Sequence, residues 1–292
     1  MNFTNKYNLP EEFIDWIKKD DYDYEYGVIS ATALLSPPRA WALRKNNWDR
    51  LEVDLTNIIS SRFGTIVHES LAECIKIDES RGDFKEKRFY TVVNGQKISG
   101  KADLFVNHTV KDYKTTSVYK YLKQDYSDYI KQLSINRYIL IKNGYEVNEV
   151  GSIYFIFNDW NKKDVIKEGY PSARIVEVKM PLMSVEETEN FIIKRLELFN
   201  NALTDLPLCS KEELWETEST FAVMKTLDAA RALRVFPTKE EADAFNAENK
   251  NIVVERKGIV KRCEYCSVHP ICEQCQQMIS ENRVANLTKD TI

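Results

Sequence analysis

Two short turns divide residues 87–113 into three predicted strands. Asn94-Gly95 separates residues 87–93 from residues 96–106, and Asn-Gly between such runs is the strongest short signal for a β-hairpin. Asn107-His108 separates the second run from residues 109–113. Because two-residue turns join antiparallel neighbours, the sequence predicts a three-stranded antiparallel sheet whose register is fixed by the turns.

This register brings acidic side chains together. Counting across the second turn places Asp103 opposite Asp112, and counting across the first places Glu86 opposite Asp103 unless a bulge shifts the pairing. Opposed side chains have Cβ atoms about 4.5–5.5 Å apart, where like charges are destabilising. A divalent cation would compensate them, since Mg²⁺ is often held by one or two carboxylates together with phosphate oxygens. We therefore expect a metal site with Asp103, Asp112 and, as a third carboxylate, Glu86.

Lys114 lies two residues beyond Asp112 and projects from the same face of its strand. Its ammonium group is therefore expected beside the metal. There it can position or deprotonate an attacking water, or offset charge that builds up on a phosphate, while the metal lowers the pKa of the water. Taken alone, a D-x-K triplet is more often a solvated strand end.

The remaining pattern predicts an α/β (α+β) fold with a mixed central sheet flanked by helices. We expect an N-terminal helical region (1–60), a core (61–205), a helical addition (206–250) and a cysteine-rich tail packed on the core (251–292). Helices are predicted at 63–77, at 126–142 and, from the Ser184/Glu187 capping box, up to residue 202; strands are predicted at 150–157, 174–180 and 251–256. The predicted buried face of the 63–77 helix comprises Ile66, Val67, Leu71, Cys74 and Ile75. The acidic stretch 20–25 is predicted to be a solvated loop.

Composition limits the classes of function. The 292 residues carry a net charge of −4, so the chain has no global basic field, although a local basic strip is enough to bind phosphates. No run of about 18 apolar residues and no signal-peptide pattern is present, which predicts a cytoplasmic protein without a membrane span.

Four of the six cysteines form the cluster Cys263-x2-Cys266-x5-Cys272-x2-Cys275, whereas Cys74 and Cys209 stand alone. In a cytosolic chain such clustering favours metal over disulfides, and either zinc or an iron-sulfur cluster suits four thiolates. The basic run of Arg256, Lys257, Lys261 and Arg262 is either a phosphate-binding strip or simply solvated. We predict that Lys261 and Arg262 contact DNA.

Several short motifs, in order and with similar spacing, resemble those of RecB-like PD-(D/E)XK nucleases. These are Gly64-Thr65-Ile66-Val67-His68, Gly100-Lys101-Ala102-Asp103, Asp112-Tyr113-Lys114 and Gln132-Leu133. The resemblance implies that His68, Asp103, Asp112 and the backbone carbonyl of Tyr113 bind Mg²⁺ or Mn²⁺, and that Lys114 is catalytic. It further implies DNA contacts by Gln132, by Tyr138, which stands two residues beyond the family's usual tyrosine position, and by the Arg39 region.

The first three clustered cysteines look like the C-terminal part of the four-iron four-sulfur site of the CRISPR-associated and AddB-type relatives. Those relatives take the remaining ligand from an N-terminal Cys-Pro-Arg, where this chain reads Ser36-Pro37-Pro38-Arg39. Cys275 is the first candidate to replace the missing cysteine, and His269 is the second. The expected role of the metal, zinc or cluster, is structural.

The leading expectation is thus a Mg²⁺- or Mn²⁺-dependent DNA nuclease, an exonuclease on single strands or duplex ends by its resemblance. It would act in recombination, repair or phage DNA processing, in the host cytoplasm if of phage origin, as a homo-oligomer or with a helicase or recombinase. The alternatives are a non-cleaving nucleic-acid-binding module that keeps the fold and the thiolate site, and a zinc-stabilised interaction protein. The acid pair with its lysine favours the enzyme.

Overall fold

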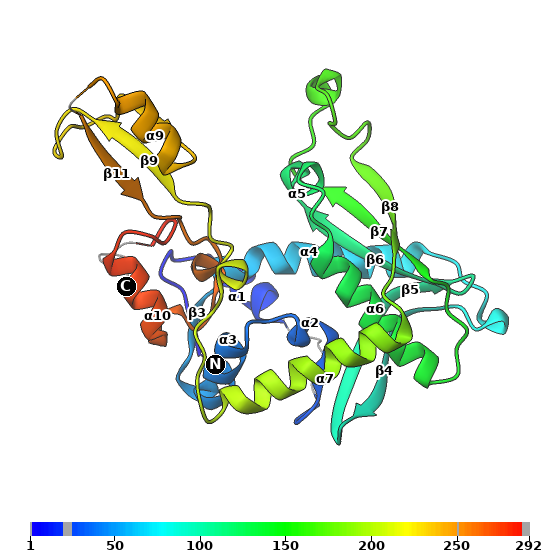
Figure 1. Cartoon of the computed structure of the whole chain (residues 1–292). Coiled ribbons are helices and arrows are strands. Elements are labelled where there is room, and N and C mark those ends of the chain that lie inside the picture. The colour runs from blue at the N-terminus through cyan, green and yellow to red at the C-terminus, as the bar shows by residue number, and fades with distance from the viewer. Residues whose placement is uncertain (1, 20–24, 250, 288–292) are drawn as a thin grey trace. The chain divides into compact units, whose positions relative to one another are not determined.

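The computed structural model describes residues 2–19, 25–249 and 251–287, so most of the loop predicted at 20–25 lies outside the described residues. The chain divides into two compact units. The larger comprises residues 3–36 and 53–204, and the smaller contains Asn2, residues 37–52 and the described part of 205–292 (Figure 1). The boundary falls within two short strands at Asn2–Thr4 and Glu52–Asp54, which are described with the larger unit. These units differ from the four consecutive segments expected from the sequence, because residues 37–52 belong with the C-terminal part of the chain. No helix among the described residues is long and apolar enough to cross a membrane.

The larger unit is a mixed α/β structure. Its elements are β1 (Asn2–Thr4), α1 (Glu11–Lys18), β2 (Ile29–Ser30), α2 (Ala31–Leu34), β3 (Glu52–Asp54), α4 (Thr56–Cys74), β4 (Phe84–Val93), β5 (Gln96–Val106), β6 (Thr109–Thr116), α5 (Val118–Leu122), α6 (Ser127–Lys142), β7 (Val150–Phe157), β8 (Ile175–Pro181) and α7 (Val185–Ala202). The central sheet has the order β2-β5-β6-β7-β8, with β4 on the other side of β5. β2 with β5 and β6 with β7 are parallel, and the other pairs are antiparallel. The predicted mixed sheet flanked by helices is therefore confirmed.

The predicted register of the first three strands is also observed. Val93 pairs with Gln96 and Val106 with Thr109. Both turns have two residues with positive φ, as type I′ hairpin turns require. Lys85 pairs with Leu104 and Lys87 with Ala102, so Glu86 occupies the position opposite Asp103.

The ladder between β5 and β6 ends where the acidic residues begin. Its last pair is Leu104 with Lys111. Beyond this pair, the N–H of Tyr113 on β6 donates to the side-chain Oδ2 of Asp103 on β5 at 2.8 Å. From Lys111 to Thr116, β6 continues alongside β7. A carboxylate has thus taken the place of a main-chain acceptor at the point where β5 and β6 part.

Helices cover both faces of this sheet. On one face α6 buries Leu133 and Leu140 against Val110 and Phe155, and α7 packs against α6 (Figure 1). Gly100 of β5 lets α6 come close, because a Cβ there would lie 2.4 Å from the Oδ1 of Asn136. On the other face α4 contacts β6.

The helix predicted at 63–77 is α4, but it begins seven residues earlier and its predicted buried face is wrong. Ile66 and Cys74 are exposed, and Val67, Leu71 and Ile75 are only partly buried. Arg62 is the buried residue of this helix. The apolar repeat predicts a helix with a buried face. In the structure α4 contacts the sheet at β6, and most of its side chains remain exposed or only partly buried.

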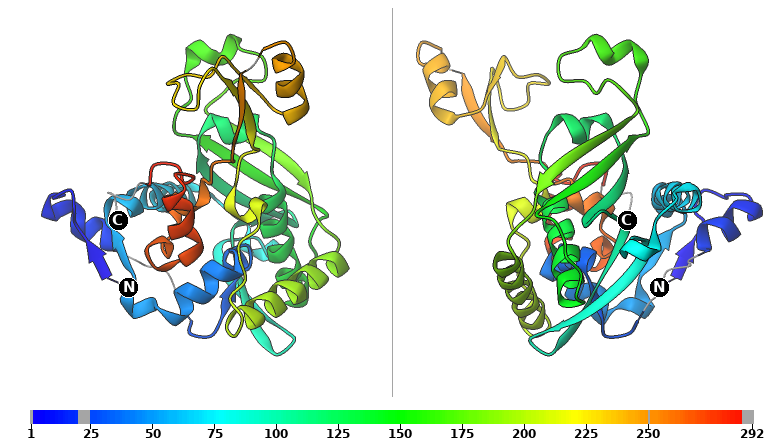
Figure 2. Two further views of the ribbon diagram at one scale, coloured as in Figure 1. Left: turned by 60° about the vertical axis from the view of Figure 1, so that its left-hand side comes forward. Right: turned by 90° about the vertical axis from the view of Figure 1, so that its right-hand side faces the viewer.

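The smaller unit contains α3 (Pro38–Asn46), α8 (Lys211–Leu214), β9 (Thr220–Met224), β10 (Arg234–Phe236), α9 (Lys239–Asn246), β11 (Ile252–Arg256) and α10 (Glu273–Ser280). The prediction that residues 206–249 are helical is wrong, because β10, β9 and β11 form a three-stranded antiparallel sheet against which α9 packs (Figure 2). The run Thr220-Phe221-Ala222-Val223-Met224 is short and ends in three buried residues. Such a run suits a central strand.

Candidate metal centre and thiol-lined cavity

Three potential metal ligands from separate elements meet beside the end of the β5–β6 ladder. They are His68 of α4, Glu86 of β4 and Asp103 of β5, and one ligand atom from each lies within 4.8 Å of the others. The Nδ1 of His68 lies 3.4 Å from the Oδ2 of Asp103 and 3.9 Å from the Oε1 of Glu86. Two carboxylates and one imidazole form a donor set suited to a hard divalent cation such as Mg²⁺ or Mn²⁺.

Glu86 is held in an uncommon conformation. Its φ is +50°, in the left-handed region that costs a residue with a Cβ about 1–3 kcal/mol. The Oε2 of Glu86 pairs with the Nζ of Lys101 at 2.7 Å, while its Oε1 is buried and lacks a hydrogen-bond partner among the described residues. A buried oxygen without a donor fits a metal ligand.

We expect the backbone strain at Glu86 to be measurable in a pair of variants. Glu86→Gly and Glu86→Ala both remove the carboxylate, but only glycine adopts positive φ without steric cost, so Glu86→Gly is expected to be more stable than Glu86→Ala by about 1 kcal/mol. Urea denaturation in the presence of a chelator measures the difference without a contribution from bound metal. Equal stability of the two variants would show that the strain is absent.

Asp112, which is buried, and Lys114, which is partly exposed, form an ion pair next to these ligands. The Nζ of Lys114 lies 2.5 Å from the Oδ2 of Asp112, and the Gln132 side chain of α6 donates to the Oδ1 of Asp112 at 3.2 Å. Burial raises the pKa of Asp112 to about 6, opposed by the charge of Lys114 and reinforced by that of Asp103. Burial acts to lower the pKa of Lys114, but the charge of Asp112 outweighs it and the pKa is raised. Lys114 is therefore held as a cation.

The pKa of His68 is also raised. Burial acts to lower it, but the hydrogen bond with Asp103 and the charges of Asp103, Asp112 and Glu86 together outweigh that effect. Since a metal-binding imidazole must be neutral, ion binding at this site is expected to release a proton.

The predicted site residues are thus brought to one place, in two groups. His68, Glu86 and Asp103 form the compact group of ligand atoms, whereas Asp112 is adjacent but is not part of that group. Tyr113 links them, because its N–H binds Asp103 and its ring meets His68 edge-on with 5.6 Å between centroids. The predicted ligation by its carbonyl oxygen stays a prediction.

Two neighbours of the site were missed in the sequence. Lys101, two residues before Asp103 on β5, pairs with Glu86, and Tyr129 of α6 has the Nζ of Lys114 5.7 Å from its ring centroid. The sequence did contain a signal for each. Lys101 is two residues from Asp103 on a strand and so shares its face of the sheet, and Tyr129 is three residues from Gln132 on a helix and so shares its face of the helix.

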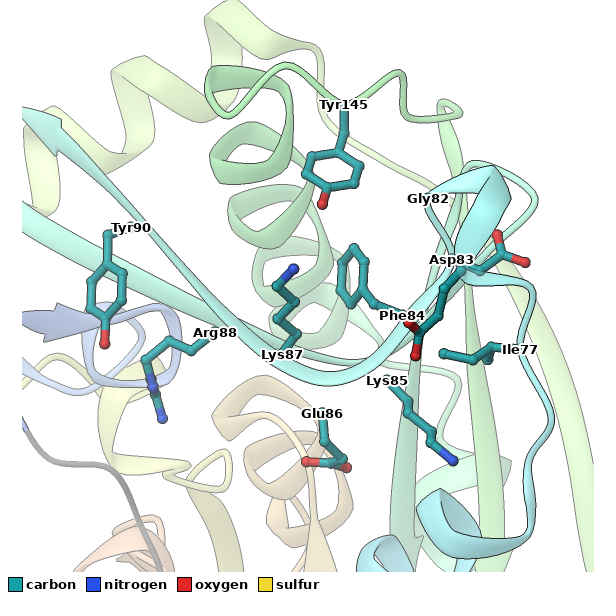
Figure 3. Close-up of a pocket in the computed structure, with 11 residues that line it drawn as sticks. Ile77, Gly82, Asp83, Phe84, Lys85, Glu86, Lys87, Arg88, Tyr90 and Tyr145 are labelled. Carbon is teal, nitrogen blue, oxygen red and sulfur yellow. The ribbon is translucent and has the colours of Figure 1, made fainter.

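A hollow of about 680 Å³ opens beside Glu86 along β4 (Figure 3). Its charged lining is mixed, with the basic side chains of Lys85, Lys87 and Arg88 and the acidic ones of Glu79, Asp83 and Glu86. Figure 3 shows Glu86 and Lys85 on one side of the strand, with Lys87 and Tyr145 on the other. The sequence had suggested no basic strip at this position.

Two residues predicted to contact DNA are instead buried, and these predictions are wrong. Tyr138 is 2% exposed within α6, and burial raises the pKa of its hydroxyl. Arg39 is 5% exposed, and its guanidinium donates to the Sγ of Cys272 at 3.1 Å and to the Pro207 carbonyl at 3.2 Å. Both were assigned from a position in a motif, which does not reveal burial.

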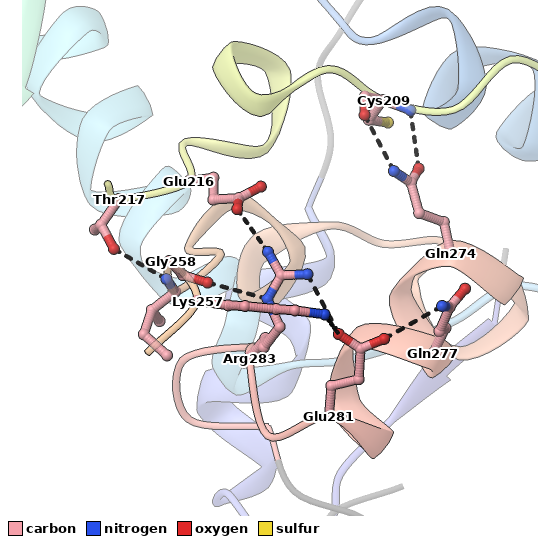
Figure 4. A network of polar contacts seen from close by, with 10 residues as sticks. Cys209, Glu216, Thr217, Lys257, Gly258, Gln274, Gln277, Glu281 and Arg283 are labelled. Atoms are coloured by element: carbon pink, nitrogen blue, oxygen red, sulfur yellow. Dashed lines mark hydrogen bonds and ion pairs between the residues drawn. The ribbon is translucent and has the colours of Figure 1, made fainter. Parts of the chain in front are cut away.

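Of the predicted basic strip in the smaller unit, Lys261 is exposed, and the guanidinium of Arg262 stacks over the Trp215 ring at 4.8 Å. Lys257 lies 3.6 Å from Glu281, next to the ion pair of Arg283 with Glu216 (Figure 4). The DNA contacts of Lys261 and Arg262 stay predictions.

The cysteine cluster lines a small cavity in the smaller unit. Cys263, Cys266, Cys272 and Cys275 surround a space of about 30 Å³ together with Cys209, which the sequence had left isolated, and with Arg39, Ala40 and His269. All six cysteines of the chain are free thiols. Soft thiolates at this density suit zinc or an iron-sulfur cluster.

The thiols influence one another. A hydrogen bond with Cys275 lowers the pKa of Cys263, and the same contact raises that of Cys275. Burial, Glu213 and the neighbouring Cys272 and Cys263 raise the pKa of Cys209 to about 12. Cys209 is therefore electrostatically part of this group.

The sulfur atoms are spread more widely than one zinc ion requires. A tetrahedral zinc site with Zn–S bonds of about 2.3 Å places its sulfurs roughly 3.8 Å apart. Among the described residues, no three cysteine sulfurs lie within 4.8 Å of one another, a condition that His68, Glu86 and Asp103 do meet. In an iron-sulfur cluster the cysteines bind different iron atoms, so their sulfurs need not lie as close together.

No protein-family model matches this chain. No curated protein sequence matches it significantly. Among solved structures, the crystal structure of SSO0001 is similar, with a TM-score of 0.44 and 19% sequence identity over 66% of this chain and 87% of that one.

Proposed function

We propose that this protein is a divalent-metal-dependent nuclease of the PD-(D/E)XK type that hydrolyses phosphodiester bonds in DNA. One observation carries the proposal: His68, Glu86 and Asp103 converge within 4.8 Å, next to the ion pair of the buried Asp112 with Lys114. Lys101 and Lys114 each pair with one of the carboxylates, but the Oε1 of Glu86 is buried without a hydrogen-bond partner among the described residues, and a bound cation would compensate the negative charge that remains there and on Asp103. A binding-only module would have no need of the arrangement.

A divalent cation bound there would polarise a phosphate oxygen and lower the pKa of the attacking water. Lys114 acts as a fixed positive charge, because its raised pKa keeps it protonated at neutral pH. It offsets the charge that grows on the phosphate as the new bond from water oxygen to phosphorus forms and the bond to the leaving oxygen breaks. Asp112 holds the ammonium group of Lys114 in position, and Gln132 in turn holds the carboxylate of Asp112.

DNA fits the surroundings of the site in spite of the net charge of −4. Lys85 lines the hollow on the same side of β4 as Glu86 (Figure 3), so a positive charge lies near the proposed metal. Phosphate binding needs such local positive charge rather than a basic protein. Action on strand ends, rather than within strands, rests on the family resemblance alone.

We propose further that the cysteines of the smaller unit hold an iron-sulfur cluster with a structural role. Their wide spacing supports a cluster over zinc, and the N–H of Arg39 that points at Cys272 would stabilise a thiolate there. Zinc remains the alternative outcome of metal analysis.

The activity is tested with labelled single-stranded and duplex DNA incubated with the purified protein. Cleavage is expected with Mn²⁺ or Mg²⁺ and is expected to stop when a chelator is added. DNA binding without cleavage under all metal conditions would favour the non-cleaving module, and the absence of both binding and cleavage at low salt would favour an interaction protein.

A further inference from the structure

Cys209 lies in the segment between α7 and α8, far in sequence from the cysteine cluster, yet it lines the same cavity as the four clustered cysteines. We propose that Cys209 is a ligand of the metal centre, an inference that rests on the proposed cluster. The ligand set is then Cys209, Cys263, Cys266 and Cys272.

The backbone of Cys209 is fixed by a residue of the cluster segment itself. The Cys209 N–H donates to the Oε1 of Gln274 at 2.8 Å, and the Nε2 of Gln274 donates to the Cys209 carbonyl at 3.0 Å (Figure 4). Gln274 stands between Cys272 and Cys275 at the start of α10. Two hydrogen bonds to the Gln274 side chain therefore fix the position of the Cys209 backbone relative to the segment that carries Cys272 and Cys275.

Arg39 makes a second connection to the same segment. Its guanidinium binds the Pro207 carbonyl, two residues before Cys209, and also the sulfur of Cys272. Segment 207–209 is thus attached at two points to the loop that carries Cys272, which is the second-sphere support expected of a ligand-bearing segment.

Five thiols line the cavity, whereas tetrahedral zinc and four-iron clusters each take four. Cys275 is the one we leave out. It belongs to the same apolar cluster as Cys263 and Cys272, but it is the most deeply buried of the three, 1% exposed against 8% for each of the others. In that position it serves as a core residue and as a hydrogen-bond partner of Cys263.

The test compares Cys209→Ser with Cys74→Ser, a matched control on the exposed surface of α4. Full-length proteins are purified without oxygen, and iron, sulfide and zinc per chain are measured together with the visible absorption spectrum. We expect Cys209→Ser to hold at least about tenfold less iron than the wild type under dilute conditions, and Cys74→Ser to match the wild type. Cys275→Ser is expected to keep the iron.

Full metal content and an unchanged spectrum in Cys209→Ser would overturn the inference. Cys209→Asp supplies a second test if the serine variant does not fold. An oxygen ligand at this position is expected to alter the electron paramagnetic resonance spectrum of the reduced cluster. An unaltered spectrum would also overturn the inference. A wild-type protein with neither iron nor zinc contradicts the metal centre as a whole. The nuclease proposal fails separately, through the DNA assay.

Discussion

Replacing Lys114 with methionine is expected to slow DNA cleavage about 10²–10³-fold while leaving the metal site able to bind Mn²⁺. Methionine keeps the apolar stem of the side chain but removes the charge that lies 2.5 Å from Asp112. A preorganised charge of this kind acts mainly on the transition state, and its loss has an effect of this size in other enzymes. Single-turnover rates at saturating DNA and Mn²⁺ measure the effect, because they separate it from substrate affinity.

Lys111→Met is the matched control for this variant. Lys111 lies on the same strand, but its side chain points to the opposite face and donates to the Tyr154 hydroxyl at 3.1 Å. Cleavage by this control should remain close to that of the wild type. If Lys114→Met and Lys111→Met cleave equally well, Lys114 has no role in the reaction.

Asp103→Asn is expected to lower cleavage at limiting Mn²⁺ by at least about 10²-fold, through weaker metal binding. The amide oxygen can still accept the N–H of Tyr113, so the fold should be retained, but one negative ligand is lost. Raising the Mn²⁺ concentration should therefore restore part of the rate. The same increase should not help Lys114→Met, because that variant lacks a charge rather than a ligand.

Asp128→Asn, on the exposed surface of α6, controls for the loss of a carboxylate elsewhere. It should need no more Mn²⁺ than the wild type. Asp103→Asn with the metal requirement of the wild type would remove Asp103 from the proposed ligands.

The part of the site formed by strand pairing was predictable because turn type and alternation are local rules. Asn94-Gly95 and Asn107-His108 set the register, and the register alone placed Glu86 opposite Asp103. What the sequence did not reveal is that β5 and β6 part at this point, so that Asp103 binds the Tyr113 N–H and approaches His68, while Asp112 pairs with Lys114. That division depends on how the strands separate, which no local pattern encodes.

Features that depend on long-range packing were missed. Cys209 looked isolated because its distance along the chain from the other cysteines says nothing about its place in the fold. Tyr138 and Arg39 were assigned to DNA from motif positions, although packing buries both. The strand β9 was read as helix because a five-residue apolar run does not distinguish a strand from a buried helical segment.

The proposed function requires that His68, Glu86 and Asp103 bind a divalent cation. Anomalous scattering from crystals soaked in Mn²⁺ tests it most directly, since the ion is located without reference to activity. We predict an anomalous peak within coordinating distance of the His68 ring and of the carboxylates of Glu86 and Asp103. Well-ordered side chains at all three positions with no peak between them, at a Mn²⁺ concentration that supports cleavage, would contradict it.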